Sequence, residues 1–169
     1  LDNGGGGNWG AGDWKSDINQ IKTIDSIEAE IKAKAAAAAA LARGEVRVPE
    51  DCKTLKEAVD RVHKDDRLTT IVLGEGEHVV EVFTAEGGYD YNHLTIESWE
   101  TMSIVGRPDV PKEKIVVVGG ITFNPGIQGN CHLQHLTLRQ AKESGVKGYS
   151  SFTMEDVLVE QCGHGVVAN

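Results

Sequence analysis

Hydrophobic residues in the first quarter of the chain recur with the period of an α-helix. Between residues 16 and 43, isoleucines appear every three or four positions and share one face with the alanines that follow. They are Ile21, Ile24, Ile27 and Ile31. This spacing is typical of an amphipathic helix, and Gly44 is typical of the position just after a helix end. We therefore predict a long Ile/Ala-rich helical extension over residues 16–44.

After Gly44 the pattern changes to short apolar runs that are separated by turn residues. Glu45–Val48 alternates as a short strand, and Thr54 with Glu57 has the spacing of a capping box, which predicts a short helix after that strand. No second long helical pattern follows Val62. This excludes a sheet built from repeated strand–helix–strand units and predicts an all-β domain over residues 45–169.

The last third of the chain contains an internal repeat. Residues 131–141 (CHLQHLTLRQA) align without gaps on residues 152–162 (FTMEDVLVEQC), at an offset of 21 residues. Apolar positions fall on apolar positions, and two outward pairs are His135 with Asp156 and Arg139 with Glu160. A period of about 20–25 residues in short β runs is typical of solenoids, in which successive coils stack in parallel. The fold prediction is therefore an all-β solenoid.

Six segments follow one another along the chain as a strand, a capping helix and then further strands, some of which end in glycine or arginine. They are Val46–Asp51, Thr54–Val59, Thr70–Leu73, Met102–Arg107, Leu136–Arg139 and Gly163–Val167. In these segments the chain resembles the opening of pectin-lyase-like proteins. The resemblance covers about residues 45–169 and implies a right-handed parallel β-helix with an N-terminal capping helix. Its last strand has no cap after it, so we expect either further coils beyond residue 169 or a partner over an open end.

Composition and charge narrow the range of partners. Among 169 residues, 17 are Lys or Arg and 26 are Asp or Glu, which gives a net charge of −9, most of it after residue 44. Nucleic acid and anionic lipid favour basic surfaces, and no apolar run reaches the roughly 18 residues of a membrane span. We therefore expect neither partner. Because the chain begins with Leu, we expect an organelle or secreted protein from which a targeting segment has been removed. The sequence does not indicate which compartment.

The outward polar positions of the repeat lack the groups of catalytic residues that the family resemblance implies for enzymes. Its lyases use carboxylate-held Ca²⁺ with a basic residue, and its hydrolases and esterases use paired aspartates. Asp156 falls on His135 rather than on a second acid, and Arg139 falls on Glu160. His132 and His135 lie three residues apart on a strand, which directs the two rings to different faces. We predict no catalytic residue, no metal and no cofactor in this segment.

Two groups of residues are candidate binding surfaces. The first joins a Gly/Trp-rich segment, residues 1–15, which we predict to be flexible, to the isoleucine face of the helix. Its residues are Trp9, Trp14, Ile21, Ile24, Ile27 and Ile31. The second is an aromatic loop with Tyr89, Tyr91 and Trp99, which suits stacking on sugar rings. For both groups, packing onto the chain's own domain is the competing interpretation.

These features favour a non-catalytic scaffold or accessory domain that mediates protein–protein interaction within a larger assembly. Its partner would bind the N-terminal helix and the open last coil. One alternative is a polysaccharide-active enzyme, a lyase, glycoside hydrolase or esterase, whose active coils lie beyond residue 169. The other is a carbohydrate-binding module that uses the aromatic loop.

Overall fold

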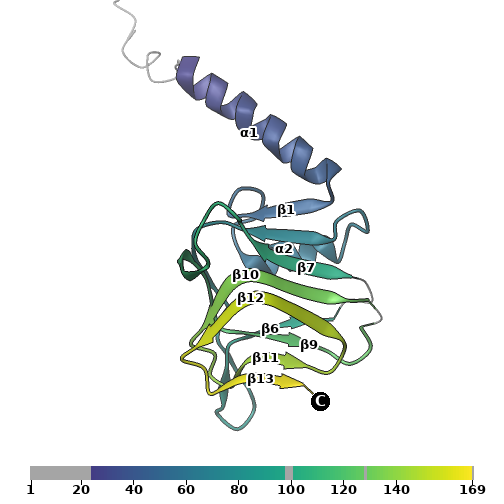
Figure 1. The fold of residues 1–169 in the computed structure, drawn as a ribbon, viewed down its shortest axis with the longest axis vertical. Coiled ribbons are helices and arrows are strands. Elements are labelled where there is room, and N and C mark those ends of the chain that lie inside the picture. Colours follow the sequence, from purple (N-terminus) through teal and green to yellow (C-terminus); the bar gives the residue numbers. More distant parts are fainter. Residues whose placement is uncertain (1–23, 98–100, 128, 169) are drawn as a thin grey trace, which may run out of the picture. The chain divides into compact units, whose positions relative to one another are not determined.

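The computed structural model describes residues 24–97, 101–127 and 129–168 (Figure 1). By their internal contacts the residues divide into two units, Leu1–Ala36 and Ala37–Asn169. Helix α1, Ile24–Ala42, begins in the first unit and ends in the second. The strands of the described residues all lie in the second unit, and so do the sites described below.

The predicted long helical extension over residues 16–44 is not shown. The described helix, α1, is 19 residues long, and residues 16–23 lie outside the described ones. Asp25 is in its first turn, where a carboxylate interacts favourably with the free N–H groups of a helix start. Gly44 follows the helix end with a positive φ of 71°, as a terminating glycine does. The isoleucine spacing therefore identifies the helix from Ile24 onward and its end, and the predicted start lies outside the described residues.

The largest sheet has seven strands, all paired in parallel. Its strands are β1 (Glu45–Val48), β2 (Thr70–Leu73), β3 (Gly76–Val79), β7 (Met102–Gly106), β8 (Ile115–Val118), β10 (Cys131–Arg139) and β12 (Phe152–Glu160). The order is β1-β2-β7-β10-β8-β3, and β12 also pairs with β10. The first half of β10 pairs with β7 and its second half with β8. Between the halves His135 has a φ of 54°, so the strand bends and the sheet curls.

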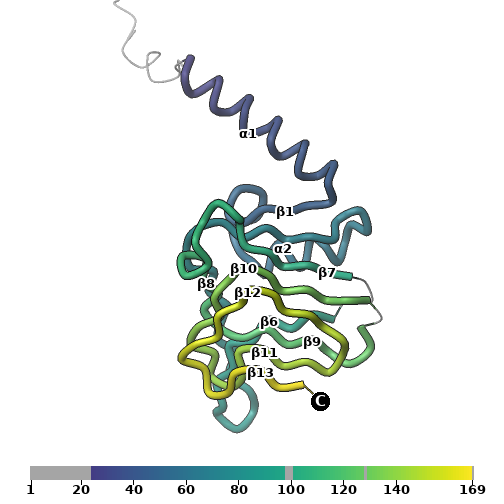
Figure 2. The backbone as a smooth tube through the Cα atoms, in the orientation of Figure 1, coloured from purple at the N-terminus to yellow at the C-terminus, as the bar shows by residue number. Residues whose placement is uncertain are grey.

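A smaller parallel sheet lies within the same unit, as the backbone trace in Figure 2 shows. Its order is β13-β11-β9-β6, with β6 at His93–Ile96, β9 at Gly120–Phe123, β11 at Ser144–Gly148 and β13 at His164–Ala168. The remaining strands, β4 (Phe83–Thr84) and β5 (Asp90–Tyr91), form an antiparallel pair. The short 3-10 helix η2 covers Lys112–Lys114.

The inward side chains of both sheets form one apolar core. Ile71 and Leu133 of the curled sheet belong to it together with Ile121 of the smaller sheet. The rings of Phe123 and Phe152 stack across the two sheets, with centroids 5.2 Å apart. Aliphatic side chains supply most of this core, in agreement with the low aromatic content of the chain.

Helix α2, Leu55–Val62, covers one end of this core. The Thr54 side chain accepts a hydrogen bond from the Glu57 backbone N–H, and the Glu57 carboxylate accepts one from the Thr54 backbone N–H. The predicted capping box is therefore confirmed. Four inward residues of the helix are buried and pack near β1 and β2. They are Leu55, Ala58, Val59 and Val62. A local sequence signal is enough here, because a capping box needs only residues that are neighbours in the chain.

The predicted fold class, an all-β solenoid with a right-handed parallel β-helix, is wrong. The described residues have mixed α/β content, with two α-helices and a curled parallel sheet. The spacing between paired strands is not constant: Glu45 pairs with Thr70, Thr70 with Ser103, and Cys131 with Phe152, which gives intervals of 25, 33 and 21 residues. The register of the 21-residue repeat itself is confirmed. The error was to extend that one regular interval to the whole domain.

Candidate functional site

The strands β12 and β13 are edge strands in the part of the chain that the structure describes. Each is paired on one side only, β12 with β10 and β13 with β11. They are the yellow strands of Figure 1. The N–H and C=O groups on the free side of an edge strand have no sheet partner, which makes such an edge able to accept another strand.

Side chains at this edge are much more exposed than their register partners one strand further in. The inward residues of β10 are fully buried, whereas those at the same positions of β12 are only partly buried. The pairs are Cys131 with Phe152, Leu133 with Met154, Leu136 with Val157, and Leu138 with Val159. In the smaller sheet, Val146 of β11 is 0% exposed and its partner Val166 of β13 is 50% exposed. These partly exposed apolar side chains are called here the edge band: Phe152, Met154, Val157 and Val159 of β12, and Val166 of β13.

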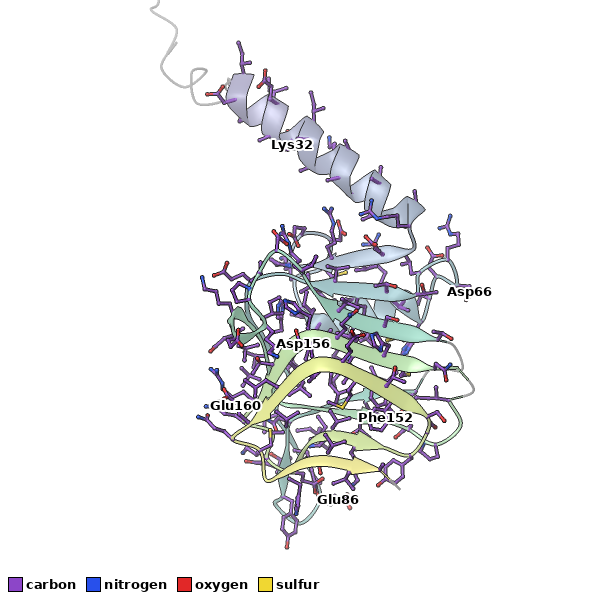
Figure 3. The ribbon with its side chains drawn as sticks, in the orientation of Figure 1. Lys32, Asp66, Glu86, Phe152, Asp156 and Glu160 are labelled. Atoms are coloured by element: carbon purple, nitrogen blue, oxygen red, sulfur yellow. The ribbon has the colours of Figure 1, made fainter. Side chains whose placement is uncertain are left out.

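The outward face of β12 is acidic. Glu155, Asp156 and Glu160 lie on it, and Figure 3 marks Phe152, Asp156 and Glu160 along the strand. The Glu160 Oε1 lies 2.6 Å from Nε of Arg139 on β10, so a neighbouring strand already supplies a basic partner to this face. Glu155 is exposed. A strand added at the free side would therefore meet apolar groups inward and carboxylates outward.

His135 and Asp156 form an ion pair at the bend of the curled sheet. His135 Nδ1 lies 2.6 Å from Asp156 Oδ2, and its Nε2 donates to the Val110 carbonyl at 2.9 Å. Lys112 binds the same carboxylate. The Val110 carbonyl and the carboxylate raise the pKa of His135, and Lys112 with His135 lowers the pKa of Asp156. These contacts fasten the segment around η2 to β10 and β12.

Stability should depend on pH through this cluster. The pKa of His135 is raised from its ordinary 6.5, so its contribution is fully present below that value and is lost as pH rises through the folded pKa. In thermal unfolding, wild type should lose its advantage over His135→Asn between about pH 6 and about pH 9. Asparagine tolerates the positive φ at this position, so the variant removes the charge with little backbone strain. A difference in melting temperature that is the same at both pH values would contradict this assignment.

His132 and His164 do not gather with the His135–Asp156 pair around one point. His132 Nδ1 is 2.7 Å from the Thr153 hydroxyl. His164 lies exposed on β13. Among the described residues, no group of three or more His, Cys, Asp or Glu side chains is arranged to hold a metal ion. The predicted lack of catalytic groups, metal and cofactor stays a prediction.

The predicted partner-binding residues fall partly outside the described residues. Ile24, Ile27 and Ile31 lie on α1 and are exposed. Trp9, Trp14 and Ile21 lie outside the described residues, so their predicted role stays a prediction.

The aromatic loop predicted to bind carbohydrate forms the β4–β5 pair. Tyr91 pairs with Phe83 across the two strands, and Tyr89 is exposed in the connecting turn. Trp99 lies outside the described residues. Phe83 is 70% exposed, and the sequence gives no signal of this, because a single aromatic residue in a short strand does not indicate which face it occupies.

Comparison with known proteins does not assign this chain to a family. No protein-family model, curated protein or solved structure matches this chain. The resemblance to pectin-lyase-like proteins therefore stays a prediction that rests on sequence segments. No helix in the described ranges is long and apolar enough to cross a membrane, in agreement with the sequence.

Proposed function

We propose that this chain is a non-catalytic interaction domain that binds an extended strand of a partner protein along the edge band of β12 and β13. The observation that carries the proposal is the contrast in burial between register partners: Val146 is fully buried and Val166 is half exposed. An apolar band beside free backbone groups is the arrangement that strand-adding interfaces use. The length of β12, nine residues, gives such a partner a long row of backbone hydrogen bonds.

The chemistry of the edge defines the strand that fits it. Its inward side chains should be aliphatic, because they would extend the contacts of Val157 and Val166. Its outward side chains should be basic, because they would face Glu155 and Glu160, as Arg139 faces Glu160 from the other side. A second copy of β12 would place carboxylates near carboxylates, which is unfavourable. We therefore assign the edge to a partner with alternating apolar and basic residues.

A segment of the chain itself provides a matched probe. Residues 131–148 already pair with β12 and β13 in a known register, and they carry Arg139, Lys142 and Lys147. A labelled synthetic peptide of this sequence, with Cys131→Ala to prevent oxidation, should bind the protein saturably in fluorescence anisotropy. Higher salt should weaken the binding, because surface charge pairs are screened. A peptide of the same composition in scrambled order is the control and should not bind.

Variants of the protein test whether the peptide binds at the edge band. Val166→Lys puts a charge into the edge band and should lower the affinity for the peptide at least about tenfold. Val82→Lys changes a residue of similar exposure that lies on neither β12 nor β13, and it should leave the affinity unchanged. Thermal unfolding checks that both variants fold. Equal affinity of all three proteins, or no saturable binding, would overturn the proposal. Concentration-dependent dimers without peptide binding would assign the edge to a second copy instead.

A further inference from the structure

A cleft opens between α2, β6 and the segment that links β3 to β4. Its volume is about 750 Å³, which lies within the usual range of ligand pockets, about 300–1,000 Å³. Two strands line it, β6 and β3. The strand β6 ends the smaller sheet, and β3 ends the path of the curled sheet. Both strands therefore have an edge without a sheet partner among the described residues.

The cleft exposes apolar side chains to water. Leu55, Val59 and Leu94 are buried residues that line it. Val79 and Phe83 also line it and are 62% and 70% exposed. Covering these side chains removes apolar surface from water, which favours binding. The ligand must therefore bring apolar groups of its own.

The charged groups of the cleft are mostly acidic. Lys56 binds Asp60 at 2.9 Å, and Glu57 accepts the Lys53 backbone N–H at 2.8 Å, so these charges have partners within the fold. Glu97 accepts a hydrogen bond from the Asn124 amide at 3.4 Å, and Glu81 interacts with Lys56 at longer range. Neither carboxylate forms an ion pair in the ranges that the structure describes. Burial lowers the pKa of His93, so its ring stays neutral near pH 7 and does not offset the carboxylates.

We propose that this cleft binds an extended peptide segment that carries lysine or arginine beside apolar residues. The aliphatic side chains would cover Val79 and Phe83, and the cation would be placed near Glu81 and Glu97. The sheet-terminal strands β3 and β6 offer backbone groups to the peptide main chain. The site is independent of the edge band, because β6 and β13 are the opposite ends of the four-stranded sheet.

The test uses a labelled peptide of alternating valine and lysine, and a valine–glutamate peptide as its charge-reversed control. Wild type should bind the lysine peptide saturably and should not bind the glutamate peptide. Glu81→Gln should lower the affinity about fivefold, the effect of removing one exposed ion pair of about 1 kcal/mol. Glu86→Gln makes the same change of charge at an acid that does not line the cleft and should leave the affinity unchanged.

The edge band also favours basic strands, so the two sites must be separated. Val166→Lys removes the share of valine–lysine binding that the edge band takes, and adding Val79→Lys should abolish the share that remains. If Val166→Lys abolishes the binding and Glu81→Gln does not change it, the peptide occupies the edge band and the cleft assignment is wrong. Absence of saturable binding, or equal binding of the glutamate peptide, also overturns it. Val166→Lys reports on the edge band and Glu81→Gln reports on the cleft, so the two proposals fail separately.

Discussion

Replacing Gly106 by alanine should destabilise the protein by more than about 3 kcal/mol, or prevent it from folding. Gly106 ends β7, beside the bend of β10. A Cβ atom at this position would overlap the His135 carbonyl oxygen and would lie 2.9 Å from Cδ1 of Ile115. The nearest atom belongs to the backbone, so no change of rotamer relieves the contact. Urea unfolding monitored by circular dichroism measures the loss.

Gly165→Ala is the matched control for this variant. Gly165 is also a strand glycine, and a Cβ there has nothing within 4 Å. Its stability should stay within about 1 kcal/mol of wild type, because alanine fits the space and loses less conformational freedom on folding. If Gly106→Ala is as stable as Gly165→Ala, then β7 and the bend at His135 do not approach each other as described.

Leu136→Ala should cost about 2–5 kcal/mol of unfolding free energy. Leu136 is 0% exposed and lies on the inner face of β10, between the two halves of the curled sheet. Truncation removes apolar contacts and leaves a cavity, because the β strands around it are held by their own backbone hydrogen bonds. Leu41→Ala makes the same chemical change at a half-exposed position of α1, and it should cost less than about 0.5 kcal/mol.

The informative result is the ratio of the two losses of unfolding free energy, that of Leu136→Ala and that of Leu41→Ala. A small effect of Leu136→Ala would mean that β10 is not the centre of the core. The same denaturation experiment serves both variants, and the slope against urea should not change, because neither substitution alters the surface exposed on unfolding by much.

The sequence predicted local features well, because their causes lie in neighbouring residues. Thr54 and Glu57 identify the capping box, and Gly44 marks the end of α1. The repeat predicted the pairing of Cys131 with Phe152, because stacked strands place equivalent side chains over one another. The same alignment explains why Asp156 repeats the positive φ of His135, with values of 52° and 54°.

The fold class could not be inferred from these features. The repeat gives one interval between neighbouring strands, and the loops before β7 and β10 lengthen the others. The bend at His135, which makes the sheet curl, uses a non-glycine residue with positive φ, for which the sequence carries no strong signal.

The cleft depends on parts of the chain that are distant in sequence, and its exposed Val79 and Phe83 resemble ordinary strand residues. An alternation of apolar residues predicts which side chains share a face. It does not predict whether another element covers that face. Exposure at β3 and β13 therefore had to come from the structure.

Amide hydrogen exchange along residues 152–168, with and without the 131–148 peptide, tests most directly whether β12 and β13 accept a strand. In the free protein, the amides of these edge strands that do not pair with β10 or β11 should exchange rapidly. Saturating peptide should slow the exchange of alternate amides in β12 and β13, and it should not change β3 or β6. Saturable peptide binding with no new protection in β12 and β13 would contradict the account.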